Sequence, residues 1–107
     1  MQAIPLGRIA VPTAGTPVAI SLTDAQAAML SAAGQCAKVE VWPDPAATGI
    51  VYVKQGGVTL AALPKATNVA NPWSTPDDCC GNRINPKAFA LDAATGNDGA
   101  FVTLWVA

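Results

Sequence analysis

Apolar and polar positions alternate in several short stretches of the chain, which is the pattern of half-buried β-strands. We expect strands over the six stretches that show it best: 7–11, 17–22, 37–42, 50–54, 87–92 and 100–106. In the third stretch, for example, Val39 and Val41 share one face. The last stretch differs, because Phe101 and Trp105 make its second face apolar as well. A strand of that kind is expected at the centre of a sandwich or beneath a neighbouring element.

Residues that favour turns separate these stretches. Gly15 and Pro17 predict a tight reversal after the first strand, and two prolines and a glycine lie within 43–49. The segment 95–99 contains Asn97 and Gly99 and predicts a hairpin before the last strand. Six or seven short strands joined in this way indicate an all-β fold, a small β-sandwich or jelly-roll-like domain. The length of 107 residues allows one such domain, spanning 1–107.

Two segments depart from the strand pattern. In the segment 23–34, Thr23 and Gln26 have the spacing of a capping box, several alanines follow, and Gly34 is placed to end a short helix. Such a helix is marginal alone and must dock on the sheet. The segment 64–86 is a long irregular loop, of a length that is usually functional or disordered. Trp73 within it argues against simple disorder.

The composition is apolar and poor in charge. Hydrophobic residues make up 51% of the chain and charged residues 12%, against about 25% in ordinary soluble domains. With a net charge of −1 the surface is poorly protected against association, which predicts a subunit in lasting contact with other protein. The alternative is an alanine-rich sequence in which Ala merely replaces Lys and Glu. The six Lys and Arg residues are scattered, which argues against nucleic-acid binding.

The sequence also limits localisation and chemistry. We expect no signal peptide and no membrane contact, so that the protein is made in cytosol and its three cysteines begin as thiols. Cys36 with Cys79 or Cys80 is the only disulfide pairing expected without strain. The absence of histidine removes the serine triad, the Cys-His pair and the zinc-protease helix, and no phosphate-binding glycine loop is present. We therefore expect no enzyme, no catalytic residue and no cofactor.

Two acidic clusters were the remaining candidates for a metal. Asp77 and Asp78, or Asp92 with Asn97 and Asp98, could supply oxygen ligands to calcium. Their spacing matches no calcium-binding loop, and Asp and Asn also serve as turn formers. We expect no metal site.

Aromatic residues are the best candidates for an interface. Trp42, followed by a proline, is expected in the core at the end of a sheet, and Trp105 is expected in the core or in an interface. Trp73, held between prolines, is either an anchor for a partner or a pin that fixes its own loop to the core. The predicted interface residues are Trp73, Phe101, Trp105 and Ile84.

Several of these stretches resemble small virion proteins of tailed bacteriophages. In the segment 7–18, a Gly-x-Ile-x-Val strand runs into Ala-Gly-Thr-Pro-Val, and the similarity continues through 37–41, 47–53, 89–93 and 99–105. The resemblance implies a capsid decoration or cement protein, a jelly-roll-like sandwich on the capsid exterior as trimers or dimers. The segment 23–34 and the long loop 64–86 depart from the family pattern.

We therefore expect a non-enzymatic virion protein that binds the major capsid protein and copies of itself and stabilises the head. The alternatives are a tail, neck or fibre-base component, and a module on the virion that binds carbohydrate or the host surface. The last of these predicts solvent-exposed aromatic residues arranged as a platform, whereas a cement protein predicts aromatic residues buried against the capsid.

Overall fold

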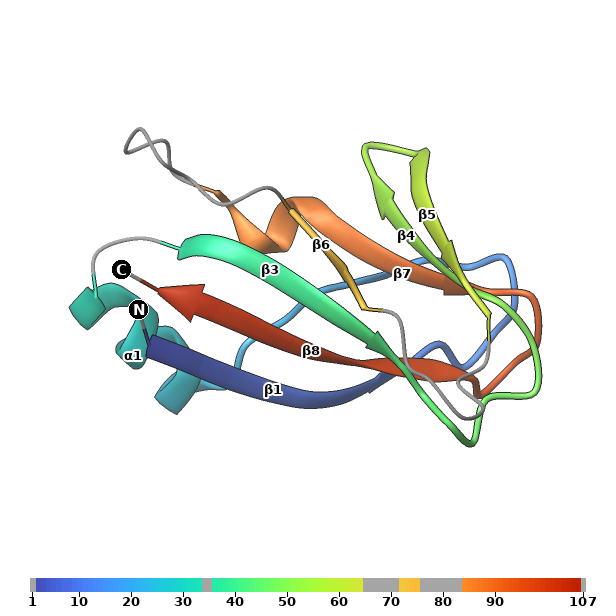
Figure 1. Cartoon of the computed structure of the whole chain (residues 1–107), viewed down its shortest axis with the longest axis horizontal. Coiled ribbons are helices and arrows are strands. Elements are labelled where there is room, and N and C mark those ends of the chain that lie inside the picture. The colour runs from blue at the N-terminus through green and yellow to red at the C-terminus, as the bar shows by residue number, and fades with distance from the viewer. Residues whose placement is uncertain (1, 34–35, 65–71, 76–83, 107) are drawn as a thin grey trace.

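Two antiparallel sheets of four strands each pack face to face in the computed structural model, which describes residues 2–33, 36–64, 72–75 and 84–106 (Figure 1). The first sheet has the order β1 (Gln2–Ala10), β8 (Gly99–Val106), β3 (Cys36–Pro43), β6 (Trp73–Ser74). The second has the order β2 (Val18–Ala19), β7 (Phe89–Ala93), β4 (Val51–Gln55), β5 (Val58–Leu63). A helix, α1 (Asp24–Ala33), and a 3-10 turn, η1 (Pro86–Ala88), complete the described elements. The predicted β-sandwich with one short helix is confirmed.

The strand order is that of a jelly roll. Consecutive strands alternate between the two sheets, with the exception of β4 and β5, which pair directly. For this reason the expected hairpin at 95–99 is wrong: the segment joins β7 to β8 and so crosses from one sheet to the other. Asn97 does take the positive φ expected there, at 69°.

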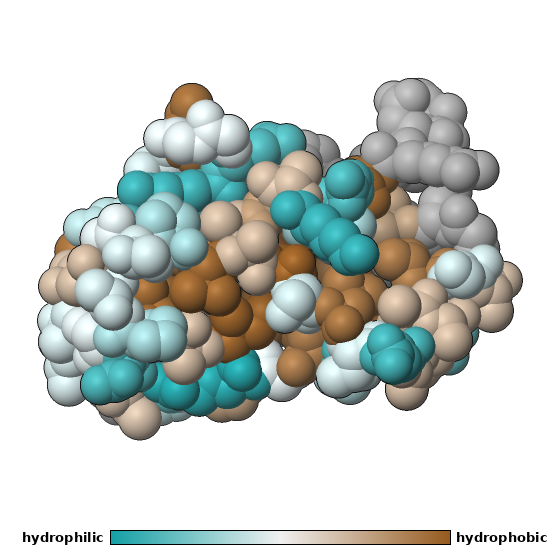
Figure 2. All heavy atoms as spheres, turned by 180° about the vertical axis from the view of Figure 1, so that it is seen from behind, coloured by the Kyte–Doolittle hydropathy of each residue, from teal (hydrophilic) through white to brown (hydrophobic). Residues whose placement is uncertain are grey.

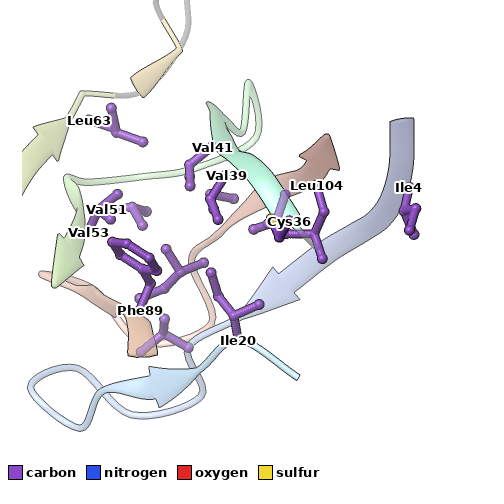
Figure 3. Packing of buried hydrophobic residues seen from close by; sticks show 14 of the residues in the cluster. Ile4, Ile20, Cys36, Val39, Val41, Val51, Val53, Leu63, Phe89 and Leu104 are labelled. Carbon is purple, nitrogen blue, oxygen red and sulfur yellow. The ribbon is translucent and has the colours of Figure 1, made fainter. Parts of the chain in front are cut away.

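The core lies between the sheets and is built from alternate residues of their strands. Val39 and Val41 of β3 face Val51 and Val53 of β4 across it, and Leu104 of the central strand β8 is also fully buried (Figure 3). The predicted faces of 37–42, 50–54 and 100–106 are therefore correct. β8 is central in its sheet, but the expectation that both of its apolar faces are covered is wrong, because Phe101 on the second face is 39% exposed.

The first two strands differ from their predicted bounds. β1 begins at Gln2, five residues before the predicted start, because it continues through a bulge between Pro5 and Gly7. Gly7 takes a φ of 76° there, which glycine adopts without strain. Before the bulge the even-numbered residue Ile4 faces inward, and after it the odd-numbered residue Ile9 does. The sequence of the whole strand therefore shows no single alternation. In the second stretch only Val18 and Ala19 pair as a strand.

Two strands were not predicted. The first is β5, which a turn of Gly56 and Gly57 joins to β4. Both glycines have a positive φ (58° and 82°), and a two-glycine turn between apolar runs is a recognised hairpin signal. β6 lies inside the segment expected to be irregular and consists of two residues that pair with β3. Elsewhere in the segment 64–86, Ile84 forms a bridge to Cys36 and Pro86 begins η1, whereas residues 65–71 and 76–83 lie outside the described residues.

The helix α1 begins as predicted. The backbone N–H of Gln26 donates to the Thr23 hydroxyl, and the Gln26 side-chain carbonyl accepts from the Thr23 N–H, at 3.2 and 2.9 Å, which completes the capping box. The Gln26 amide also donates to the carbonyl of Pro5 at 3.1 Å and so fastens the helix to β1. Gly34, the predicted end of the helix, lies outside the described residues.

Hydrogen bonds join three connections at one end of the sandwich, which we call the latched end and define by Arg8, Asp44, Thr48, Asn97 and Asp98. The Asp98 carboxylate accepts from the N–H of Thr48 and from that of the next residue, Gly49, at 3.0 and 2.8 Å. The Arg8 guanidinium donates to Asp44 and to the carbonyl of Asn97, both at 2.7 Å. Just after β1, the Val11 N–H donates to the carbonyl of Asp98 and the Val11 carbonyl accepts from the N–H of Asn97, both at 2.8 Å, so that the connections after β1, β3 and β7 are tied together.

Candidate interaction surface

The outer face of the first sheet carries the aromatic residues of β3 and β8. The strand registers place Phe101 beside Trp42 on one side and Arg8 on the other. Two residues further along β8, Thr103 lies beside Glu40. We call this surface the aromatic face and define it by its outward-facing residues: Arg8, Lys38, Glu40, Trp42, Phe101, Thr103 and Trp105.

Two aromatic side chains of this face are open to solvent. Trp42 is 38% exposed and Phe101 is 39% exposed. The expectation that Trp42 belongs to the core is wrong, because the alternation of β3 sends Val41 inward and its neighbour outward. The Trp42 indole N–H donates to a Glu40 carboxylate oxygen at 2.6 Å, which holds the ring against the strand. The aromatic face therefore presents an apolar pair that the described chain leaves uncovered.

The charges around this pair are balanced. Arg8 lies 2.7 Å from the carboxylate of Asp44, and the Lys38 ammonium lies 3.9 Å from that of Glu40. The Arg8 hydrogen bond, together with the N–H of Ala46, holds the pKa of Asp44 below its usual value, so this carboxylate stays charged at neutral pH. A surface of paired charges around exposed rings has little net field, and it suits a partner that is itself apolar or polar without strong charge.

Trp105 lies at the other end of the aromatic face and is half-buried. Its indole N–H is buried and has no hydrogen-bond partner among the described residues. Buried N–H groups are rarely left in this state, because their desolvation is not compensated. Within the described residues, Trp105 therefore contributes apolar contact and no hydrogen bond to this face.

A second feature lies between β5 and β6, where the two sheets diverge. A cavity of about 700 Å³ opens there, and we call this region the open side; its lining residues are Gln55, Leu60, Trp73, Thr75, Ile84, Asn85, Ala88 and Phe89. Trp73 is half-buried, and its ring centre lies 5.9 Å from that of Phe89 at an interplanar angle of 57°. Of the two roles expected for Trp73, the structure therefore supplies the contact with its own core.

Ile84, which lines the open side, is bridged to Cys36 at the start of β3. The Ile84 N–H donates to the carbonyl of Cys36 at 3.2 Å, and Ile84 packs against the core. Cys36 is a buried free thiol, and burial raises its pKa despite a hydrogen bond to the carbonyl of Lys38, so it remains protonated. Cys79 and Cys80 lie outside the described residues.

The second acidic cluster acts within the fold. Asp98 accepts hydrogen bonds from Thr48 and Gly49, which lower its pKa. Burial raises the pKa of Asp92, but its contacts with the Lys54 ammonium (3.1 Å) and the N–H groups of Ala93 and Gly15 outweigh this effect and lower it. No group of three potential metal ligands occurs within the described ranges, and Asp77 and Asp78 lie outside them.

Of the four predicted interface residues, two share one surface and two share another. Phe101 and Trp105 lie on the aromatic face, whereas Trp73 and Ile84 line the open side. Sequence reasoning missed Trp42 and Leu60. Strict alternation from Val39 and Val41 indicated that Trp42 faces outward. The Gly56–Gly57 turn indicated the hairpin that carries Leu60.

Comparisons with known proteins give no match. No family model matches the sequence, and neither a curated protein nor a solved structure matches the chain. Within the part of the chain that the structure describes, no helix has the length and apolar character needed to cross a membrane.

Proposed function

We propose that this protein is a non-enzymatic structural subunit of a bacteriophage virion that decorates the outer surface of the capsid and reinforces it. The observation that carries the proposal is the aromatic face, on which Trp42 and Phe101 stand exposed among paired charges. An uncovered aromatic pair of this kind is typical of protein interfaces, where aromatic residues supply most of the binding energy.

The composition supports the same proposal. Only 12% of the residues are charged, so the surface resembles that of a chain kept in contact with other protein. Reinforcement of a shell needs no catalytic group. A small protein that bridges neighbouring capsomers raises the free energy needed to separate them, and symmetry repeats each contact many times over the shell. Its partners are then the major capsid protein and copies of itself. The jelly roll itself does not decide the location on the virion, because this fold serves many functions.

The test locates the protein and its contact surface together. Virions made from the genome that carries the gene are stripped of the protein, mixed with the purified chain, and imaged by cryo-electron microscopy. We expect density at regular positions on the head, with the aromatic face against the capsid. Density at the tail alone, or none on the particle, would contradict the proposal and favour a tail, neck or fibre-base component.

A variant pair tests which surface makes the contact. Replacement of Trp42 and Phe101 by Ser should weaken rebinding at least tenfold, because it removes the two exposed rings of the aromatic face. The control replaces Met29 and Ile50, which are exposed to a similar degree (42% and 39%), by Ser and should rebind normally. Equal rebinding of both variants would place the contact elsewhere.

A carbohydrate-binding module is the second candidate, and the same two rings favour it. Neighbouring exposed aromatic residues with a carboxylate close by, here Glu40 at the edge of Trp42, can stack on sugar rings and accept from their hydroxyls. Titration with soluble oligosaccharides of the bacterial cell envelope, followed by tryptophan fluorescence, tests it. Saturable binding that is lost in the variant lacking Trp42 and Phe101 would support this candidate.

A further inference from the structure

The jelly roll has four described sheet edges, and three of them are protected against pairing with another chain. An exposed edge strand offers unpaired N–H and C=O groups to any extended chain, and folded proteins usually block such edges. β2 and β6 are only two residues long, which is itself a common protection.

β1 is long but is blocked in three ways. Pro5 lacks an N–H, the bulge before Gly7 bends the strand, and Arg8 carries a charge. In addition, the Gln26 side chain of α1 donates to the Pro5 carbonyl at 3.1 Å and occupies one of the acceptors of this strand. A second chain therefore cannot extend the first sheet at β1.

β5 has almost none of these protections. Its six residues, Val-Thr-Leu-Ala-Ala-Leu, include no charge and no proline. Val58 is 62% exposed and Leu60 is 41% exposed, and β5 ends its sheet among the described strands. Its one irregularity is the bulge that leaves Leu60 without a partner on β4 and directs it to the cavity of the open side.

We propose that β5 is a self-association site, at which it pairs antiparallel with β5 of a second copy of this chain. The other three edges are blocked, so a copy that approaches this edge has only its own β5 to offer among the described strands. Pairing of a surface with itself is two-fold symmetric and stops at a dimer instead of growing into a filament. It joins the second sheets of two copies into one continuous sheet.

Charge favours the second copy as the occupant. Two uncharged strands can approach each other without repulsion, whereas like charges placed opposite each other would oppose pairing. The nearest cation on the neighbouring strand, Lys54 of β4, is already paired with Asp92 at 3.1 Å. The partner that this edge fits is therefore as uncharged as the edge itself.

The cavity lies beside this edge and adds apolar area to the contact. A strand added to β5 would direct alternate side chains toward the first sheet and so toward Trp73 at the edge of that sheet. Pairing alone covers a strip roughly 20 Å long and about 5 Å wide, an area well below the ~800 Å² per partner of a stable interface. We therefore expect a dimer that is weak in dilute solution and forms where copies are concentrated.

This inference deepens the proposed function, because it names the surface through which neighbouring subunits join. Its test uses the purified chain without capsids, so failure of self-association and failure of capsid binding are separate results. The first measurement is analytical ultracentrifugation over a wide range of protein concentration. A monomer–dimer equilibrium is expected. A monomer at every concentration, or a trimer, would overturn the proposal.

Charged variants test the surface. Val58→Lys combined with Ala62→Lys places like charges on both edges and should raise the dissociation constant of the dimer at least tenfold. The control Met29→Lys adds the charge to α1, at a residue exposed to 42%, and should dimerise normally. Thermal melting of each variant establishes that it is folded. A folded double variant that dimerises as well as the parent chain would contradict the proposal.

A charge exchange makes the test independent of folding losses. The matching variant with Val58→Glu and Ala62→Glu should also be monomeric alone, whereas an equal mixture with the Lys variant should form a mixed dimer. Hydrogen exchange should then show protection of the β5 amides in the mixture but not in either variant alone. Mixing without recovery, or protection at another strand, would show that β5 is not the contact.

Discussion

The latched end and the open side of the sandwich differ in how far their polar and apolar groups find partners within the chain. At the latched end, Asp98 and Arg8 satisfy backbone groups of three connections, and Gly99 lets β8 lie close against β1. The open side borders a cavity of about 700 Å³, and β5 beside it carries the exposed apolar side chains of Val58 and Leu60. One region is complete within the chain, whereas the other leaves apolar surface and backbone groups available.

The difference indicates how stability and binding are divided. Polar groups with full sets of partners fix a unique local structure, and changes to them leave buried groups unsatisfied. Exposed edges and cavities contribute little to folding, because their atoms already contact water. We therefore expect substitutions at the latched end to affect stability, and substitutions at the open side to affect association.

The largest effect is expected for Gly99→Ala. An added Cβ would overlap the carbonyl oxygen of Ile9 on the neighbouring strand, and a backbone atom of a paired strand cannot move away without breaking the sheet. The melting temperature should fall by more than roughly 15 °C. Calorimetry or circular dichroism measures it. A fall of only a few degrees would mean that the two strands can separate at little cost.

Asp98→Asn should have the next largest effect. The amide keeps the shape but replaces one of the two carboxylate oxygens by an NH2 group, which faces the N–H of either Thr48 or Gly49, so that one of these two N–H groups loses its acceptor. A fall of the melting temperature by roughly 8–15 °C is expected. Glu40→Gln, a similar change on the aromatic face, is the control and should cost much less. Equal losses would show that the latched end is not special.

Acid should weaken the latched end. The pKa values of Asp44 and Asp98 are lowered in the folded state, so the folded chain binds fewer protons than the unfolded chain, whose aspartates titrate near pKa 3.9. Their stabilisation is complete above about pH 5 and is lost as the pH falls through about 3.9 toward the lower folded values. Melting temperatures between pH 6 and 3 should fall less for Asp98→Asn than for the parent chain. Parallel curves would contradict this linkage.

Trp73→Ala should cost less, because the ring is half-buried and borders a cavity that already exists. Loss of its contact with Phe89 should lower the melting temperature by roughly 5–8 °C without preventing folding. Phe101→Ala, which truncates an exposed ring, is the control and should cost less still. If Trp73→Ala does not fold, the open side is a part of the core and the contrast with the latched end fails.

Val58→Lys should have the smallest effect on stability. The side chain is 62% exposed at the tip of the β4–β5 hairpin, so its replacement should shift the melting temperature by no more than roughly 3 °C at low protein concentration. At high concentration the parent chain should gain stability from dimer formation, whereas the variant should not. A large loss in dilute solution would mean that the apolar side chain of Val58 supports folding.

The sequence predicted the fold correctly where apolar and polar residues alternate strictly and where two residues have the spacing of a helix cap. Val39, Val41 and Leu104 follow strict alternation and are all buried, and Thr23 and Gln26 form the capping box that their spacing indicates. The start of β1 could not be found in this way, because a bulge before Gly7 changes the inward positions. The crossing at 95–99 was mistaken for a hairpin, since turn residues specify a reversal and not the sheet that the next strand joins.

The candidate surfaces were harder to predict than the fold. Phe101 and Trp105 were identified from the apolar second face of one strand, but whether a neighbour covers that face depends on tertiary packing. Trp42 faces outward although a proline follows it, because the alternation of β3 decides the side on which it lies. The open edge of β5 could not be predicted from the sequence. A strand is recognised as an edge only when the order of the strands in its sheet is known.

Hydrophobic surface is not confined to the aromatic face. Seen from behind, the molecule shows a band of apolar atoms across its middle, bordered by hydrophilic residues (Figure 2). The aromatic face and this opposite side both offer contact area, so a single subunit can touch more than one neighbour.

The pairing of β1 with β8 also has a kinetic consequence. Gln2 lies opposite Val106, and the partner strands of the first sheet come from distant parts of the chain. Loop closure of that length slows folding, and domains dominated by such pairings fold in milliseconds to seconds. During synthesis the first sheet cannot close until β8 has left the ribosome, so β5 and the other strands of the second sheet emerge before their core is complete. A nascent chain with this strand order must fold quickly after β8 is made, or bind a chaperone, so that its uncharged strands do not associate with other chains.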